Sequence, residues 1–499
     1  MINSRGYSIS KDDTRIPSEG IEKALIVKPM VYSTGGGRKG FRQSENDKFS
    51  VYRESTKRYY MPRVYGIEKY GKPTHDMFEG RYVHLDDNVC EFKGDLREHQ
   101  IESVSRIQKN YSSVGSCLLC LPCGYGKTCV AIHMISKMKV KTLVVVHKEF
   151  LMTQWAERIQ EFLPNARIGY IQQNKCDIED KDVVLAMLQS VSMRDYDKSV
   201  FDGFGQLILD ECHHIAARAF SNAMFKVQCK YMLGLSATPE RADGLTILLK
   251  WFLGEFEIPV SRPKNYTVHV DIVKNPTLYD LQDQLPGGAI RKASMAGMIT
   301  KLGDDLERNK LLLDKLESVI KDTPNRKVII LSDRREHLTY LYKQITTKTN
   351  MKKENSSLSG MTCGMYIGGM KKQDLKESED CDIIVSTYSM TSEGFDIPSL
   401  NTLFLSTPKS NIEQSVGRIL RKSSDINPLV VDTYDNHGLL EGMYRKRIRF
   451  YKKNGYAIDY GDNRPGGRVF QGGVSIKTTQ VPGDKQKNTL DKYAFNDDY

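Results

Sequence analysis

Short apolar runs alternate with longer amphipathic stretches over most of the chain, and this alternation predicts the fold. Between residues 94 and 260, five apolar runs are of strand length, and the stretches between them are long enough for helices. The runs are SCLLCLP (116–122), KTLVVVH (141–147), KDVVLAM (181–187), FGQLILD (204–210) and YMLGLSAT (231–238). Continuous apolar runs are typical of parallel strands that helices cover on both faces. The pattern therefore predicts repeated βαβ units around a parallel sheet.

The same alternation returns in the second half of the chain. A helix is expected over roughly 303–321, followed by strands at RKVIILS (326–332), CDIIVST (381–387), NTLFLST (401–407) and NPLVVDT (427–433). We therefore expect an α/β protein with two tandem parallel-sheet domains. The predicted organisation is an N-terminal accessory domain (1–92, with strands suggested in the tyrosine-rich stretch 51–71), a first domain (93–262), a linker (263–302), a second domain (303–458) and a flexible tail (459–499).

Composition narrows the class of protein. The 499 residues are 39% hydrophobic and 27% charged, which suits about three folding units. No run approaches the roughly 20 apolar residues of a membrane span, and the N-terminus lacks a signal-peptide pattern, so we expect an intracellular protein. The net charge of +11 favours a polyanionic partner such as nucleic acid, although a solvated basic surface is the alternative.

Ten cysteines in a chain of this length do not form a disulfide scaffold, and they favour a reducing compartment. Cys117, Cys120 and Cys123 form a C-x2-C-x2-C run that raises the alternative of a metal or iron–sulfur site. Against that alternative, the first two lie in the apolar run CLLCL, and no matching Cys/His pair is near.

The segment LPCGYGKT (121–128) follows an apolar strand and precedes a helical run. A glycine-rich turn lets backbone N–H groups surround phosphate oxygens, and the helix N-terminus adds a positive dipole. In this pattern Lys127 reaches the β- and γ-phosphates and Thr128 binds Mg²⁺. Leu121 stands where the strict phosphate-loop pattern has glycine, so only the GxGKT half is present.

A pair of acidic residues further along the chain supports the interpretation of LPCGYGKT as a phosphate loop. The strand FGQLILD is followed by ECHH, so the adjacent carboxylates Asp210 and Glu211 stand at a strand end. Downstream of a phosphate loop, such an Asp holds the metal and the following Glu orients and deprotonates the attacking water. Arg418 and Arg421 lie three residues apart on one helical face, where guanidinium groups can stabilise the developing phosphoryl charge. Together the phosphate loop and the two carboxylates predict nucleotide hydrolysis with Mg²⁺.

The motifs, taken together, resemble superfamily 2 DExH-box helicases. DECH (210–213) resembles the DExH box, LREHQ (96–100) the adenine-contacting element, TSEGFDIP (391–398) a motif spanning nucleotide and nucleic acid, and IEQSVGRILRK (412–422) the QxxGRxxR motif. Within the superfamily, LPCGYGKT, HKEFLMTQW (147–155), LGLSATPERAD (233–243) and DRREHLTYL (333–341) look like the XPB/UvsW type and the helicases of large cytoplasmic DNA viruses. The resemblance implies two RecA-like domains.

The resemblance also assigns roles to residues. It implies catalytic roles for Lys127, Asp210, Glu211, Gln414, Arg418 and Arg421, and ATP binding by Arg97, Gln100, Leu121, Pro122, Cys123, Gly124, Tyr125, Gly126, Lys127, Thr128, Gly394 and Asp396. It implies that His213, Ser236, Ala237 and Thr238 couple ATP state to strand movement, and that Gln189, Ser190, Thr387, Thr391 and Ser392 contact nucleic-acid phosphates. Thr128 and Asp210 are the expected Mg²⁺ ligands.

These observations predict an ATP-dependent helicase or translocase, for which the resemblance implies DNA and 3′→5′ movement. The alternatives are an RNA helicase, a duplex-DNA translocase that does not unwind, and a non-catalytic nucleic-acid-binding scaffold. The basic stretch MYRKRIRFYKK (443–453) is either a further phosphate track or a solvated helix face. If the viral likeness holds, the expected setting is host cytoplasm or virion, with transcription or replication and repair machinery as partners.

Overall fold

The computed structural model divides the chain into two units, Met1–Lys264 with Ser389–Pro398 and Asn265–Tyr388 with Ser399–Tyr499. Each is described by itself. The structure describes residues 1–16, 20–33, 40–43, 47–122, 124–215, 217–238, 244–257, 267–277, 279, 282–284, 290–292, 294–352, 354–392, 397–420, 426–461, 470–471 and 474–475. None of the helices within these ranges is both long and apolar enough to cross a membrane.

The first unit is built on an eight-stranded sheet in the order β12-β11-β13-β10-β14-β15-β9-β16. All neighbouring strands run parallel except β11 and β12. The strands are β9 (Ser116–Cys120), β10 (Thr142–Val146), β11 (Ile168–Gln172), β12 (Lys175–Asp177), β13 (Val183–Met187), β14 (Gln206–Leu209), β15 (Tyr231–Ser236) and β16 (Phe256–Glu257). The predicted parallel sheet is confirmed.

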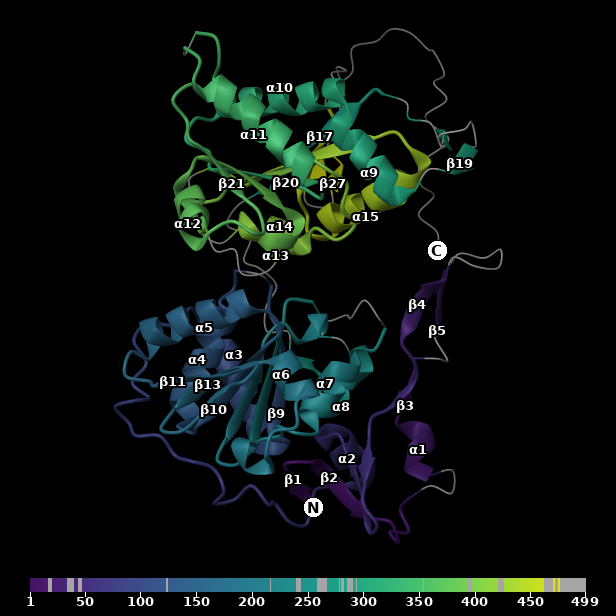
Figure 1. Ribbon diagram of the computed structural model, residues 1–499, viewed down its shortest axis with the longest axis vertical. Coiled ribbons are helices and arrows are strands. Elements are labelled where there is room, and N and C mark those ends of the chain that lie inside the picture. Colours follow the sequence, from purple (N-terminus) through teal and green to yellow (C-terminus); the bar gives the residue numbers. More distant parts are fainter. Residues whose placement is uncertain are drawn as a thin grey trace. The chain divides into compact units, whose positions relative to one another are not determined.

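Helices cover both faces of this sheet (Figure 1). Apolar side chains of α3 (Glu98–Ser113), α4 (Lys127–Met138) and α5 (Glu149–Phe162) share one core with one face of the strands. Those of α6 (Leu188–Met193), α7 (Ala217–Met224) and α8 (Thr246–Leu253) share a second core with the other face. Because the central strands β9, β10, β13, β14 and β15 are buried on both faces, their sequences are largely continuous apolar runs rather than alternating ones.

The N-terminal residues form a smaller antiparallel sheet in the order β1-β2-β8-β7. Its strands are β1 (Ile2–Asn3), β2 (Gly6–Ser10), β7 (Arg53–Glu54) and β8 (Arg58–Met61); the region also holds α1 (Gly20–Ala24), β3 (Ile26–Val27), β4 (Met30–Ser33), β5 (Gly40–Gln43), β6 (Phe49–Ser50) and α2 (Arg63–Tyr70). The suggestion of strands over 51–71 is therefore wrong for its second half, where Pro62 precedes helix α2. Buried Arg63 donates to the carbonyl of Lys230 at 2.8 Å, so this region packs on the larger sheet.

The second unit contains a nine-stranded sheet in the order β21-β22-β20-β23-β24-β17-β25-β26-β27. The strands are parallel up to β25, and β26 and β27 are antiparallel. They are β17 (His269–Asn275), β20 (Val328–Ser332), β21 (Cys363–Tyr366), β22 (Ile383–Thr387), β23 (Thr402–Leu405), β24 (Leu429–Asp435), β25 (Ala457–Asp459), β26 (Phe470–Gln471) and β27 (Val474–Ser475); β18 (Gln282–Gln284) and β19 (Ile290–Lys292) form a separate pair.

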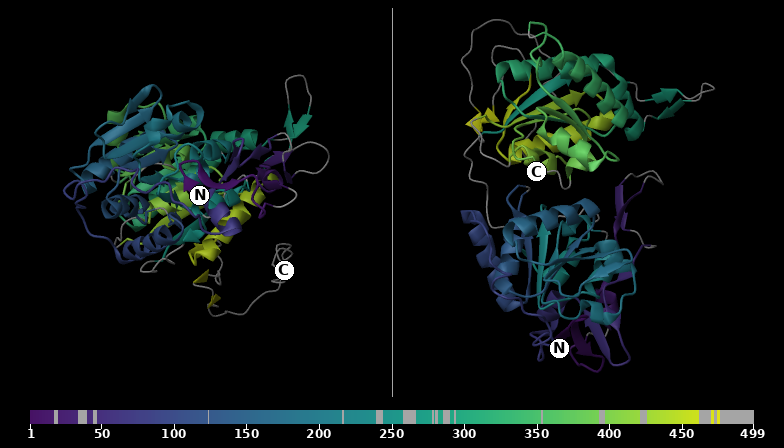
Figure 2. Two further views of the ribbon diagram at one scale, coloured as in Figure 1. Left: turned by 90° about the horizontal axis from the view of Figure 1, so that it is seen from below. Right: turned by 60° about the vertical axis from the view of Figure 1, so that its left-hand side comes forward.

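The helices of this unit are α9 (Met295–Asp304), α10 (Leu306–Asp322), α11 (Arg335–Thr349), α12 (Lys372–Asp380), α14 (Glu413–Arg418) and α15 (Gly438–Lys453), whereas α13 (Tyr388–Ser392) belongs to the first unit from Ser389 onward. Helices α10 and α11 bury leucine and isoleucine side chains against the strands. Figure 2 shows the strands and the helices that flank them from two further directions. Strand β17 lies within 263–302, the segment expected to be a linker, and pairs with β24 over seven residues.

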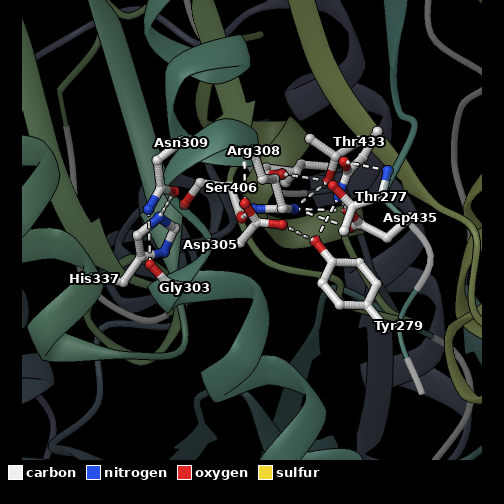
Figure 3. Close-up of polar contacts among 12 residues, drawn as sticks. Thr277, Tyr279, Gly303, Asp305, Arg308, Asn309, His337, Ser406, Thr433 and Asp435 are labelled. Atoms are coloured by element: carbon white, nitrogen blue, oxygen red, sulfur yellow. Dashed lines mark hydrogen bonds and ion pairs between the residues drawn. The ribbon is translucent and has the colours of Figure 1, made fainter. Parts of the chain in front are cut away.

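A buried ion pair joins a helix of the second unit to its sheet. Arg308 at the start of α10 donates to both carboxylate oxygens of Asp435 at the end of β24, at 2.7 and 2.9 Å. The same guanidinium donates to the carbonyl of Ser406 at 2.7 Å (Figure 3). Asn275 donates to Asp435 at 2.9 Å. Because both charges are buried and fully engaged, this cluster fixes the start of α10 on the ends of the strands. The flexible tail expected over 459–499 falls largely outside the described residues.

Candidate active site

The phosphate loop connects β9 to α4. Gly124 and Gly126 have φ values of +84° and +78°, a conformation that favours glycine, and Gly126 immediately precedes the helix. Lys127 is the first residue of α4 and is buried, with its Nζ 3.4 Å from the carbonyl oxygen of Leu121. Thr128 follows it in the first turn of the helix. Cys123 of the predicted ATP-binding set lies outside the described residues.

The start of α3 is hydrogen-bonded to this loop. Gln100 accepts from the backbone N–H of Arg97 at 2.8 Å and donates to the carbonyl of Tyr125 at 3.3 Å. His99 contacts the same carbonyl at 3.2 Å, and its ring lies 4.9 Å from the Tyr125 ring. A Cβ atom at Gly126 would lie 2.2 Å from the Gln100 amide nitrogen. The structure thus brings two predicted adenine-contacting residues, Arg97 and Gln100, to the phosphate loop.

The two adjacent carboxylates follow β14, at the same edge of the sheet. Asp210 is 6% exposed, and its Oδ1 accepts the backbone N–H of Glu211 at 2.9 Å. Burial, and then the neighbouring charge of Glu211, raise the pKa of Asp210 above its usual range. Glu211 has a φ of +45°, and its Oε1 lies 3.3 Å from the Nζ of Lys127. The predicted catalytic residues of the first domain are therefore in direct contact.

A chain of contacts leads from the carboxylates to the neighbouring strand. His213, in the short 3₁₀ turn Cys212–His214, has its Nδ1 3.4 Å from the Oε2 of Glu211 and 3.0 Å from the Oγ of Ser236. The hydroxyl oxygen of Ser236 also accepts the backbone N–H of Thr238 at 3.3 Å, and Ala237 beside it is buried. The predicted coupling residues thus form a continuous path from Glu211 to the end of β15.

One contact was not predicted from the sequence. The indole N–H of Trp155 on α5 donates to the Oδ2 of Asp210 at 2.8 Å. The sequence signal is the Gln-Trp pair that ends HKEFLMTQW, but a tryptophan on an amphipathic helix usually indicates core packing. The indole N–H of Trp155, rather than the apolar part of its ring, therefore contacts the candidate active site.

The predicted nucleic-acid contacts differ in exposure. In the first unit, Gln189 is exposed and donates to the carbonyl of His147 at 3.2 Å, whereas Ser190 is buried and accepts the backbone N–H of Gln173 at 2.9 Å. Thr387 ends β22 and is partly exposed, while Thr391 on α13 is buried. Gln189 and Thr387 are the better placed of these four side chains for contacts with phosphates. The side chain of Ser392 lies outside the described part of the chain.

Two of the remaining predicted residues are described in the second unit. Gln414 and Arg418 lie on α14, the first partly exposed and the second buried. Arg421, Gly394 and Asp396 fall outside the residues that the structure describes. On α15, Arg447 of the basic stretch is buried against Asp432 at 2.8 Å, while Arg445, Lys446 and Arg449 are exposed.

Asp210 and Thr128 offer the oxygen ligands that Mg²⁺ prefers, a carboxylate and a hydroxyl. A buried carboxylate whose pKa is raised by desolvation is a favourable position for a cation, because the cation would compensate the buried negative charge. Mg²⁺ is commonly held by one or two protein ligands together with substrate phosphates and water, so two residues suffice. Within the described ranges, no group of three or more His, Cys, Asp or Glu side chains is placed to hold a metal ion.

The run of three cysteines has a structural explanation for its first two members. Cys117 and Cys120 are buried on β9, and burial raises the pKa of the Cys117 thiol. A thiol in this environment behaves as a small apolar side chain, because the thiolate that binds metals is disfavoured. The third cysteine, Cys123, is the one outside the described residues.

Comparison with known proteins agrees with this geometry. Residues 93–241 match the family model described as "Type III restriction enzyme, res subunit", and residues 311–423 match "Helicase conserved C-terminal domain". A protein of Acanthamoeba polyphaga mimivirus, named as an ATP-dependent RNA helicase, is 32% identical over 92% of this chain and 86% of its own length. A protein of Invertebrate iridescent virus 6, named as a helicase, is 28% identical over 73% of this chain and 82% of its own.

Among solved structures, T4 UvsW is similar over 82% of this chain and 90% of its own, with 16% identity and a TM-score of 0.31, which is too low to support an argument. The family matches and the mimivirus relative define the class: an ATP-hydrolysing helicase with two helicase domains. The chain belongs to the superfamily 2 helicases, in the group that includes these helicases of large DNA viruses. The resemblance inferred from the motifs is thereby confirmed.

Proposed function

We propose that this helicase uses ATP to move along DNA in the 3′→5′ direction and to separate its strands. The observation that carries the proposal is the continuous contact from Lys127 through Glu211 and His213 to Ser236. It joins the residues suited to hydrolysis to those expected to respond to ATP state. The choice of DNA and the direction of movement rest on the XPB/UvsW resemblance of the motifs.

In the proposed hydrolysis step, ATP binds with its phosphates at the loop before α4. The phosphates compete with Glu211 for Lys127, because both offer negative oxygens to the same ammonium group. Release from this ion pair leaves Glu211 able to orient a water molecule and accept its proton. Thr128 and Asp210 would hold Mg²⁺, which would neutralise part of the phosphate charge.

The remaining catalytic groups come from the second helicase domain. Arg418 and Arg421 would stabilise the charge that develops on the γ-phosphoryl group, and Gln414 would act beside them. A site that needs groups from two domains is complete only when those domains close. Binding of ATP and release of phosphate can then drive relative movement of the domains, which is how hydrolysis would be converted to steps along a strand.

Contacts with the nucleic acid are proposed to go mainly to phosphates, which suits a motor that must cross any sequence. Gln189 and Thr387 are the side chains proposed for this role. The exposed basic face of α15, which includes Arg445, Lys446 and Arg449, remains either a further phosphate track or a solvated face. Because the mimivirus relative is named as an RNA helicase, RNA is the alternative track.

Steady-state ATP hydrolysis tests the proposal, measured without nucleic acid and with single-stranded DNA, duplex DNA or RNA. Stimulation by DNA that is lost in Glu211→Gln supports the proposed motor and its track. Stimulation by RNA alone rejects DNA and keeps the helicase assignment. No ATP turnover above background, or a Lys127→Ala variant indistinguishable from wild type, would favour a non-catalytic nucleic-acid-binding scaffold.

Strand separation and direction need a second assay. Duplexes with a single-stranded tail at either the 3′ or the 5′ end distinguish the two directions, since a 3′→5′ motor requires the 3′ tail. Stimulation by duplex DNA without strand displacement would instead identify a translocase that does not unwind. We further propose an intracellular setting, host cytoplasm or virion, with transcription or replication and repair proteins as partners.

A further inference from the structure

Trp155 lies in the apolar core of the first unit but directs its polar atom toward the site. Its side chain is 1% exposed and packs with Leu151, Met152 and Ile159 of the same helix in the core shared by α3, α4 and α5. The indole N–H is a donor only, and a buried donor without an acceptor is costly by about 1–3 kcal/mol. Here the acceptor is the Oδ2 of Asp210, at 2.8 Å. The hydrogen bond therefore joins the α5 helix to the carboxylate expected to hold Mg²⁺.

The two oxygens of Asp210 are fixed separately. Oδ1 accepts the backbone N–H of Glu211 at 2.9 Å, and Oδ2 accepts the indole N–H. Rotation of the carboxylate about its terminal torsion would break both hydrogen bonds, so together they set its orientation. Each oxygen keeps a further lone pair, because an ionised carboxylate offers about four acceptor positions. The carboxylate is thus oriented and still able to bind a cation or a cation-bound water.

Packing in the apolar core also holds the Trp155 ring in place. It lies on α5 in the same core as α4, the helix that begins at Lys127 and Thr128. A side chain held by packing and also hydrogen-bonded to a metal-binding carboxylate is the kind of outer partner that sets ligand orientation and metal affinity. Core packing alone would require an apolar ring but would not require its N–H to meet this carboxylate.

We propose that Trp155 is a positioning residue for ATP hydrolysis: its N–H holds the Asp210 carboxylate in the orientation that binds Mg²⁺ together with ATP. The inference rests on the proposed role of Asp210 as a metal ligand. It adds a residue that neither the phosphate loop nor the DECH box contains.

The test measures nucleotide binding as a function of Mg²⁺ in the full-length protein. A fluorescent ADP analogue is titrated with Mg²⁺ present and with Mg²⁺ removed by EDTA. In Trp155→Phe an aromatic ring remains and the N–H donor is lost. We expect the Mg²⁺ concentration for half-maximal binding to rise about 10-fold or more, in line with the effect of removing an outer partner of a metal ligand. Binding in EDTA should stay at the wild-type value, which a general packing defect would not allow.

Trp251→Phe is the matched control, because the chain has only two tryptophans. Trp251 lies on α8, with its ring 5.5 Å from that of Tyr65, so its removal leaves the hydrogen bond to Asp210 in place. This variant should show wild-type Mg²⁺ dependence. Equal Mg²⁺ dependence in Trp155→Phe and wild type would overturn the proposal and leave Trp155 with a packing role alone.

Two further measurements separate the possible failures. Asp210→Asn should lose the Mg²⁺ dependence of binding; if it does not, the proposed role of Asp210 fails, whatever Trp155 does. Should Trp155→Phe be too unstable to purify, Trp251→Phe protein still provides the test, since Trp155 is then its only tryptophan. Its emission should change when Mg²⁺ is added to the ADP-bound protein and revert with EDTA. An unchanged emission during Mg²⁺-dependent binding would contradict the proposal.

Discussion

Lys127 and Glu211 form an ion pair, with 3.3 Å between Nζ and Oε1, although 84 positions separate them in the chain (211 − 127). They meet because β9 and β14 are parallel strands of one sheet, with only β15 between them, and their carboxyl ends lie at one edge. The carboxylate that is proposed to activate water thus contacts the lysine that is proposed to bind phosphate. Binding of the phosphates and release of the base are therefore linked events in the proposed mechanism.

This relationship predicts that Glu211→Gln separates nucleotide binding from turnover. The amide cannot accept a proton from water, so hydrolysis should fall by about 100-fold or more, the usual contribution of a general base. ATP affinity should be equal to wild type or tighter, because a neutral amide competes less with phosphate for Lys127. Equilibrium binding of a fluorescent ATP analogue and single-turnover hydrolysis measure the two quantities.

The matched control for this prediction is Glu68→Gln, which removes the same charge from an exposed position on α2. It should leave both binding and turnover unchanged. If Glu211→Gln hydrolysed ATP at the wild-type rate, another group would have to be the base. If it lost ATP binding, the ion pair would be supporting the loop rather than competing with the phosphates.

The contact between Gln100 and the phosphate loop leads to a second prediction. Gly126→Ala would place a Cβ 2.2 Å from the Gln100 amide nitrogen, and it would force an L-residue to a φ of +78°. The backbone strain alone costs about 1–2 kcal/mol, and displacement of Gln100 also disturbs the Tyr125 carbonyl that it holds. We expect loss of ATP binding together with a lower melting temperature, measured by titration and by thermal unfolding.

Gly80→Ala separates strain from the clash. Gly80 has a φ of +70°, and no atom lies within 4 Å of the position that its Cβ would take. The substitution should lower stability by a similar strain energy, about 1 kcal/mol, and leave ATP binding intact. Equal loss of ATP binding in both variants would show that stability, and not the Gln100 contact, limits binding.

A third prediction concerns the path from the DECH box to β15. Ser236→Ala removes the hydroxyl that contacts His213 at 3.0 Å, while Lys127, Asp210 and Glu211 are unchanged. We expect strand displacement to fall by a larger factor than ATP hydrolysis, because the hydrolytic groups remain and their connection to the next strand is lost. Both rates are measured on the same tailed duplex.

Ser116→Ala is the control for that variant, since Ser116 is also buried but lies at the start of β9, the opposite end of the sheet from the site. Ser116→Ala should not lower strand displacement by a larger factor than ATP hydrolysis. Proportional losses of hydrolysis and displacement in Ser236→Ala would contradict a coupling role and indicate a general effect on the site.

The sequence allowed prediction of the parts of the fold in which each residue has one dominant environment. Strands β9, β10, β13, β14 and β15 are buried on both faces, so they are continuous apolar runs that can be located without the structure. The meeting of the phosphate loop with Asp210 and Glu211 was predictable for a related reason, because the carboxyl ends of parallel strands share an edge.

The remaining features depend on partners distant in the sequence. β17, HVDIVKN, has exposed and charged residues between its apolar ones and follows a Pro- and Asn-containing stretch, so its sequence resembles a linker. Arginine and aspartate are usually exposed in folded proteins. Only the folded chain shows that Arg308 and Asp435 are buried together. Likewise, the Gln-Trp pair that ends HKEFLMTQW does not by itself indicate that the Trp155 N–H meets Asp210.

The last prediction concerns acid stability of the second unit, where His337 is buried (Figure 3). Its Nε2 lies 2.8 Å from the Oδ1 of Asn309 and its Nδ1 lies 3.1 Å from the Oγ of Ser332, contacts that suit a neutral ring donating through Nε2. Burial, and then the positive charge of Arg308, lower the pKa of His337 to about 3.

In the unfolded chain the pKa of a histidine is about 6.5, so between pH 6.5 and pH 3 the unfolded state binds the extra proton. The free energy of unfolding should therefore fall as the pH is lowered through this window, by about 2 kcal/mol between pH 7 and pH 5. Urea unfolding of wild type and His337→Gln at both pH values measures it: the stability advantage of wild type should shrink by that amount at pH 5. His75→Gln, at an exposed position, is the control and should give the same difference from wild type at both pH values. A His337→Gln difference that does not change with pH would show that His337 takes up its proton over the same pH range in the folded and the unfolded protein.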